Sequence, residues 1–165
     1  MKKLFLTAIV TGASLLAVAA PNAYEGGLKP LLKEVKINGQ VLYSDDMKET
    51  KTVDVKTDKP MTVEYTFVNK GDAPSVGIGK VFVHFMKGDK IARGGDFSPS
   101  MPTDKWKKDF VFKQTLKYDM KALKGAKTEM YVGLYFYKEK KSPRINFVNK
   151  MASGQRVKVG DINFQ

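Results

Sequence analysis

The chain has a mass of 18.4 kDa and 165 residues, of which 42% are hydrophobic and 28% charged. This composition describes one globular domain and excludes disordered and collagen-like chains. With one histidine and no cysteine, the chain lacks disulfides and the usual ligands of zinc, haem and iron–sulfur sites. We therefore expect no metal and no cofactor. The formal net charge is +12.

The first 23 residues have the composition of a secretory signal peptide. Lys2 and Lys3 give a basic start, an apolar run extends to Ala20, and small residues follow. We predict that residues 1–23 are a cleaved leader and that residues 24–165 form a single domain without a transmembrane span. A membrane anchor is the alternative, but Gly12 and Ser14 interrupt an apolar run that is only about as long as the shortest spanning helices. Export predicts a periplasmic or extracellular protein.

Removal of this leader takes away two lysines and leaves a net charge of +10. Outside the cytoplasm, such a charge favours an anionic envelope polymer, lipid head groups or an acidic envelope protein as partner over nucleic acid, for which the chain has no motif. The alternative is that the lysines only keep a β surface soluble. Arginine occurs only at Arg93, Arg144 and Arg156, which favours diffuse attraction over bidentate recognition.

From about Leu31 onward, apolar and polar residues alternate, with turn residues every eight to twelve positions, as in β-sandwiches and barrels. Asn38-Gly39 favours a tight hairpin turn between short strands. The turn Asp58-Lys59-Pro60 predicts a hairpin-like connection between the strands on either side of it. Predicted strands of this half are Glu34–Ile37, Gln40–Tyr43, Lys51–Lys56 and Met61–Val68.

The next predicted strand, Lys80–Met86, is apolar on both faces, which indicates a central strand covered on each side. The long loop Gly94–Lys105 contains two glycines and two prolines and ends at Trp106, the only tryptophan. Phe110–Tyr118 then alternates as a half-buried strand. Met120–Leu123 predicts one helical turn.

The strand Met130–Tyr137 places three tyrosines on one face, namely Tyr131, Tyr135 and Tyr137. Arg144–Val148 predicts a short strand, and Gln155–Phe164 predicts the last one. A bulge at Gly160 would bring all apolar residues of the last strand to one side. Together these elements predict an all-β fold, an immunoglobulin-like antiparallel β-sandwich of about eight to nine strands.

Catalytic motifs are absent from the sequence. It contains no nucleophile elbow, zinc-protease motif, phosphate-binding loop or calcium loop. His84 lies between Val83 and Phe85 with no acid or nucleophile beside it, so we interpret it as a hydrogen-bonded histidine of the core or its rim. We therefore expect a protein that is not an enzyme.

The aromatic residues Trp106, Tyr131, Tyr135 and Tyr137 are candidates for ligand binding, because aromatic rings with polar edges stack well on sugars. The alternative is that Trp106 pins the long loop and the tyrosine row packs a second layer.

Several segments, taken in order and spacing, resemble a β-sandwich module found at the extracytoplasmic end of some bacterial membrane glycosyltransferases and in other surface proteins. The resemblance covers Lys80 to Gln165, about half of the chain, and it departs from the module in lacking an attached transferase and in being richer in lysine. The matching segments are Val81–Phe85, Gly95-Asp96, Pro102–Trp106, Val132–Tyr135, Arg144 and Val159–Phe164.

The resemblance implies a non-catalytic, immunoglobulin-like accessory module that contacts glycans. From their place in the matching segments, we expect His84, Asp96 and Arg144 to lie near the ligand with the aromatic residues. The predicted function is an exported binding module for an envelope glycan. The alternative is a structural or assembly protein of the cell envelope that acts through protein–protein contacts, for instance by pairing a sheet edge with a partner strand.

Overall fold

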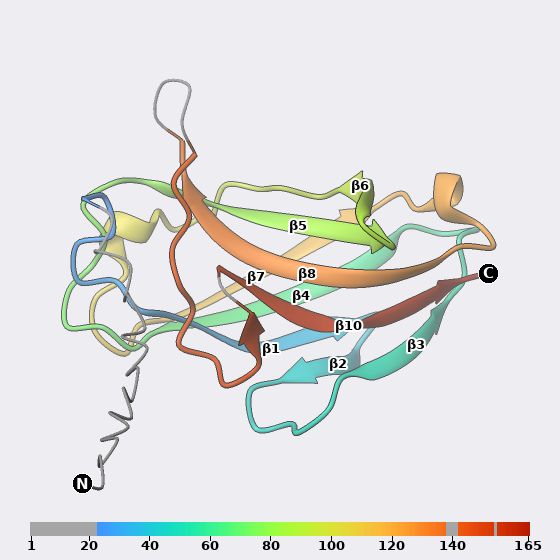
Figure 1. Cartoon of the computed structure of the whole chain (residues 1–165), viewed down its shortest axis with the longest axis horizontal. Coiled ribbons are helices and arrows are strands. Elements are labelled where there is room, and N and C mark those ends of the chain that lie inside the picture. The colour runs from blue at the N-terminus through green and yellow to red at the C-terminus, as the bar shows by residue number, and fades with distance from the viewer. Residues whose placement is uncertain (1–22, 138–141, 154) are drawn as a thin grey trace, which may run out of the picture.

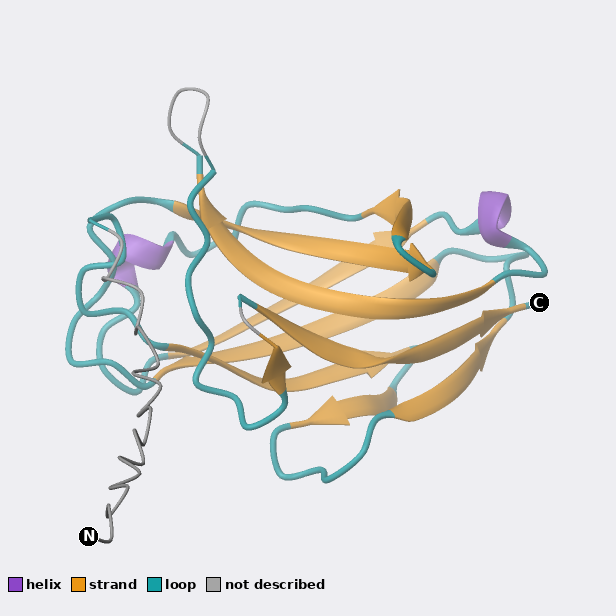
Figure 2. Ribbon diagram, in the orientation of Figure 1, coloured by secondary structure: helices purple, strands orange, loops and turns teal. Residues whose placement is uncertain are grey.

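The structure is a computed structural model that describes residues 23–137, 142–153 and 155–165. All but the last residue of the predicted leader thus lies outside the described residues. Within the described ranges, no helix is long and apolar enough to cross a membrane. Strands dominate, and two short 3-10 helices, η1 and η2, lie at opposite ends of the domain (Figure 2). In chain order the elements are β1 (Pro30–Ile37), β2 (Gln40–Ser44), β3 (Lys51–Val55), β4 (Met61–Asn69), β5 (Gly79–Lys87), β6 (Lys90–Gly94), η1 (Thr103–Lys105), β7 (Val111–Tyr118), η2 (Lys121–Leu123), β8 (Lys127–Phe136), β9 (Ala152–Ser153) and β10 (Arg156–Phe164).

The strands form two sheets, with β8 and β10 in front of β1, β4 and β7 in Figure 1. One sheet has four strands in the order β2-β1-β4-β7, and the other has six, in the order β3-β10-β8-β5-β6 with β9 beside β10. The described strands pair antiparallel except β3 and β10, which run parallel. The predicted all-β, immunoglobulin-like sandwich is confirmed. The described residues form ten strands instead of eight or nine, and β9 has only two residues.

Two local predictions from turn chemistry are confirmed. Asn38 and Gly39 join β1 and β2 with φ angles of 50° and 81°, the positive values that a tight hairpin turn requires. In β10 the register against β8 shifts between Lys158 and Gly160, which brings the apolar residues of both parities to the core. A Cβ on Gly160 would lie 2.7 Å from the carbonyl oxygen of Lys51, so only glycine fits this bulge.

The predicted hairpin between the third and fourth strands is wrong. β3 pairs with β10 in the six-stranded sheet, whereas β4 lies between β1 and β7 in the other sheet. The Asp58-Lys59-Pro60 turn therefore carries the chain from one sheet to the other. Alternation in sequence shows that one face of a strand is buried, but it does not identify the partner strand.

The predicted strand Arg144–Val148 is also wrong, because this segment makes only an isolated bridge between Arg144 and Tyr135. The next residue, Asn149, is buried and ties this segment to β1. Its side-chain NH₂ donates to the carbonyl oxygen of Leu32, and its side-chain oxygen accepts the N–H of Leu32. The helical turn predicted at Met120–Leu123 is present as η2.

Trp106 lies in the core with 0% of its surface exposed. Its ring packs 4.9 Å from the Phe112 ring and 5.8 Å from the Phe67 ring, measured between centroids. The indole N–H donates to the carbonyl oxygen of Met101, at 2.8 Å, and Asn69 donates to the Trp106 carbonyl at 2.7 Å. Trp106 therefore anchors the long loop, and the prediction that it stacks on a ligand is corrected.

Candidate functional site

The outer face of the six-stranded sheet brings together most of the predicted site residues. Side chains of alternate residues point outward from β5, β8 and β10, and the strand register aligns them in rows across the sheet. Adjacent rows are roughly 7 Å apart, since two residues separate them along each strand. Three consecutive rows, which we name the arginine face, are Lys80–Tyr135–Arg144, Phe82–Gly133–Arg156 and His84–Tyr131–Lys158.

Phe82 points outward, yet only 2% of its surface is exposed. Its ring lies over Gly133, because a Cβ added to that glycine would be 2.0 Å from Cζ of Phe82. The guanidinium carbon of Arg144 lies over the ring, 4.6 Å from its centroid, and the His84 ring lies 4.8 Å away. A glycine, a phenylalanine and an arginine thus form a stack on the sheet.

A second stack occupies the neighbouring rows. The guanidinium carbon of Arg156 lies 4.2 Å from the centroid of the Tyr131 ring, and the Tyr131 hydroxyl donates to Glu129, at 3.1 Å. Neither Arg144 nor Arg156 forms an ion pair with a carboxylate of the described residues. Stacking fixes the plane of a guanidinium while leaving N–H donors at its edge. This arrangement suits bidentate binding of a carboxylate or a phosphate, whereas the low arginine content favoured diffuse attraction.

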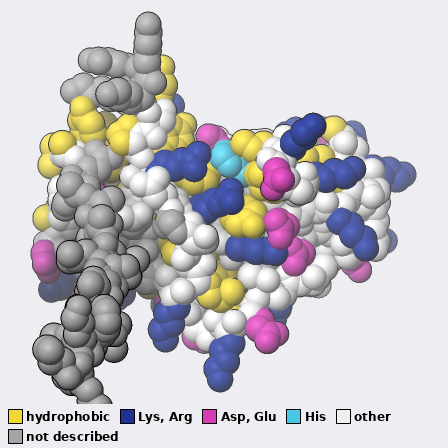
Figure 3. All heavy atoms as spheres, in the orientation of Figure 1, with side chains coloured by type: hydrophobic (Ala, Val, Ile, Leu, Met, Phe, Trp, Pro, Cys, Tyr) yellow, Lys and Arg dark blue, Asp and Glu magenta, His cyan; other side chains and the backbone are white. Residues whose placement is uncertain are grey.

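Charge varies along the arginine face. At one end Lys158 pairs with Glu129 and with Asp161, so its charge is neutralised locally. The rows of Arg144 and Arg156 contain no such pair among the described residues. Asp96 lies beside Phe82 at the β6 side of the sheet, where its carboxylate accepts the N–H of Val83 at 3.1 Å. Figure 3 shows this side of the molecule, with Lys and Arg side chains gathered around a histidine.

Of the residues predicted for the site, His84, Asp96, Tyr131, Tyr135 and Arg144 gather on or beside the arginine face. Tyr137 lies one row beyond it, and Trp106 is in the core. Phe82, Gly133 and Arg156 were not among the predicted site residues. Arg156 could have been found from the alternation of β10, because its neighbour Val157 points inward. The contact between Phe82 and Gly133 depends instead on the register of two strands, in which the paired residues are 51 positions apart.

The environment of His84 predicts how this part of the surface responds to pH. Burial lowers the pKa of the imidazole below its usual 6.5; Asp96 opposes this shift, while Arg144 and Arg156 add to it. The unfolded chain therefore takes up a proton before the folded chain does, and stability falls as the pH drops below about 6.5. NMR titration of the single histidine should give a pKa below 6.5. A His84→Gln variant should show a weaker loss of stability between pH 7 and pH 5.5. An imidazole pKa at or above 6.5 would show that Asp96, and not burial, dominates the environment of His84.

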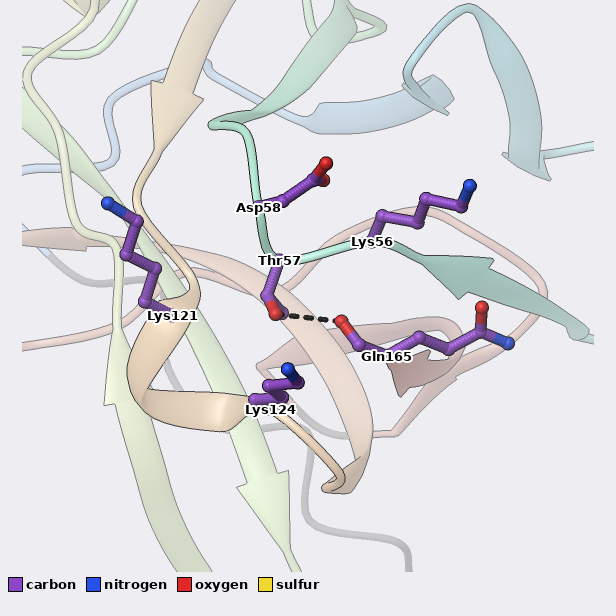
Figure 4. A pocket seen from close by; sticks show the side chains of 6 residues that line it. All are labelled: Lys56, Thr57, Asp58, Lys121, Lys124 and Gln165. Carbon is purple, nitrogen blue, oxygen red and sulfur yellow. Dashed lines mark hydrogen bonds between the residues drawn. The ribbon is translucent and has the colours of Figure 1, made fainter.

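A hollow of about 410 Å³ lies elsewhere on the surface, lined by Lys56, Thr57, Asp58, Lys121, Lys124 and Gln165. Thr57 donates its hydroxyl to the carbonyl oxygen of Gln165, at 2.7 Å. Lys56 and Lys121 extend away from this hydrogen bond, on different sides (Figure 4). The lysines do not converge on one point, so the arginine face is the better candidate site. Among the described residues, no cluster of His, Asp and Glu side chains suits a metal ion.

No protein-family profile matches the chain, and no curated protein matches its sequence. Among solved structures, the chain is similar to a Niemann-Pick type C2 protein from Japanese carpenter ant, with 12% sequence identity and a TM-score of 0.45, covering 85% of this chain and 96% of that chain. A likeness of this size carries no function over, and what the chain does depends on the residues of its own surface.

Proposed function

We propose that the chain is an exported, non-catalytic binding module that holds an acidic glycan of the cell envelope on its arginine face. The observation that carries this proposal is the pair of guanidinium groups, Arg144 and Arg156, each stacked on an aromatic ring in adjacent rows. Each presents donors in a plane that matches a carboxylate or a phosphate.

The rest of the face suits a sugar. Tyr135 is half-buried between Lys80 and Arg144, which leaves part of its ring and its hydroxyl for the apolar face and the hydroxyl groups of a pyranose. Burial raises the pKa of the Tyr135 hydroxyl, and the Asp96 carboxylate adds to the effect. The hydroxyl therefore stays protonated over the whole physiological pH range, with its O–H directed at Asp96 and its oxygen left to accept from a sugar hydroxyl.

Binding of an oligogalacturonate, measured by calorimetry against a neutral oligosaccharide, tests the proposal. All described strands lie within residues 24–165, so the protein without its predicted leader is used. Replacement of both Arg144 and Arg156 by lysine keeps the charge but removes the planar donors. We expect affinity to fall about tenfold or more, the size of a lost charge-assisted hydrogen bond.

The matched control is Lys113→Ala with Lys117→Ala, which removes two exposed cations from β7 of the other sheet. This variant should bind within about twofold of the original protein. Weaker binding by the β7 variant, together with unchanged binding by the arginine-to-lysine variant, would show diffuse charge attraction and contradict the proposal.

A further inference from the structure

The row that follows the arginine face toward one end of the sheet is apolar and exposed. Gly79 pairs with Phe136 where β5 begins and β8 ends. Ile78 and Tyr137 come directly beyond these strand ends, and alternation along the chain gives them the outward parity of Lys80 and Tyr135. Their exposed fractions are 62% and 68%, and Val76, two residues earlier, is 73% exposed. Figure 3 shows hydrophobic side chains at this end of the domain.

The backbone beneath these side chains is held in place. Gly77 donates its N–H to the carbonyl oxygen of Tyr24, at 3.1 Å, and the Tyr24 ring packs 6.1 Å from the Phe136 ring. The Ser75 hydroxyl donates to the Gly77 carbonyl, at 2.6 Å. The chain thus presents large apolar side chains to solvent from a supported segment, and such exposure typically marks a contact surface.

Along this sheet face the side chains therefore change from apolar to cationic and then to ion-paired. The apolar row of Ile78 and Tyr137 is followed by the rows that carry Lys80, Arg144 and Arg156, and then by the ion pairs of Lys158. Asp96 is the carboxylate placed beside these cationic rows, and one of its oxygens already accepts a backbone N–H. An anionic bilayer has the same order: an apolar interior, then negatively charged head groups, then water.

We infer that this end of the sheet docks on an anionic lipid membrane, with Ile78 and Tyr137 entering the interface while Arg144 and Arg156 hold the head-group phosphates. Tyrosine favours this depth because its ring is apolar and its hydroxyl remains hydrated. The apolar face of a sugar ring suits a flat aromatic ring such as Tyr135 and not the branched side chain of Ile78, and a second copy of the chain would bring like charges together. The inference rests on the proposed function in one respect, namely the arginines as an anion site.

The test is co-sedimentation with vesicles of phosphatidylcholine containing phosphatidylglycerol, with the protein that lacks its predicted leader. The variant Ile78→Ser with Tyr137→Ser should bind these vesicles at least about fivefold more weakly, because the apolar contribution is lost. Its affinity for the soluble oligogalacturonate should not change. Both residues are exposed, so the fold should persist, and unfolding in denaturant verifies this.

The matched control is Ile91→Ser, which removes an isoleucine that is 53% exposed on the β6 hairpin and should leave vesicle binding unchanged. Equal vesicle binding by the Ile78/Tyr137 variant and the original protein would overturn the inference. Binding of the oligogalacturonate without any binding of vesicles would also overturn it, while leaving the proposed function standing. Binding of vesicles that depends on Ile78 and Tyr137, without binding of the oligogalacturonate, would support the lipid contact and overturn the glycan proposal.

Discussion

Replacement of Trp106 by alanine should lower the free energy of unfolding by about 3–5 kcal/mol, the usual cost of truncating a large aromatic residue in a core. The indole is fully buried among Phe67 and Phe112, and its N–H closes the end of the long loop on Met101. Truncation leaves a cavity and removes this hydrogen bond. The expected effect is on stability, because no atom of the indole reaches the arginine face.

Urea unfolding followed by circular dichroism measures this change, since the variant has no tryptophan to report fluorescence. A Trp106→Phe variant should lose less stability than the alanine variant, because it retains most of the ring packing but not the hydrogen bond to Met101. Under conditions where the alanine variant remains folded, it should bind the oligogalacturonate as the original protein does. A variant of unchanged stability that no longer bound this ligand would instead place Trp106 in the binding site.

Much of the fold was predictable because alternation reports directly on burial. β4 and β8 each have one apolar face, and the predicted bulge at Gly160 was needed to give β10 a single buried face. Pairing between distant strands was not predictable in this way. The pattern of β3 suits either sheet, and the structure joins it to β10 across more than a hundred residues.

The same contrast between local alternation and distant pairing applies to the candidate site. The outward tyrosines of β8 and the outward His84 of β5 follow from local alternation, and the structure places them on one face. Trp106 was assigned to the ligand because of its residue type, whereas its burial depends on how the loop packs over β4 and β7. The two stacks depend on which residues face each other across strands, so Gly133 and Phe82 carry no signal that can be recognised one strand at a time.

Gly133→Ala is expected to damage both the fold and the site. A Cβ at this position would lie 2.0 Å from Cζ of Phe82 and 2.7 Å from the carbonyl oxygen of Gln155, distances that a packed structure does not tolerate. Relief requires the Phe82 ring to leave the sheet, which removes the surface on which Arg144 lies. We expect stability to fall by about 1–3 kcal/mol, as for other overpacked sites, and affinity for the oligogalacturonate to fall at least about fivefold, because Arg144 is no longer held in its plane.

Gly94→Ala is the matched control. Gly94 faces His84 on the neighbouring strand, and a Cβ there would meet no heavy atom within 4 Å, so neither stability nor affinity should change appreciably. A double-mutant cycle with Phe82→Ala then identifies the source of the damage. If the contact with Phe82 dominates, Gly133→Ala should cost much less stability in the Phe82→Ala background than in the original chain. An equal cost in both backgrounds would assign the strain to Gln155, and unchanged ligand affinity in the Gly133→Ala variant would show that the stack does not position Arg144 for binding.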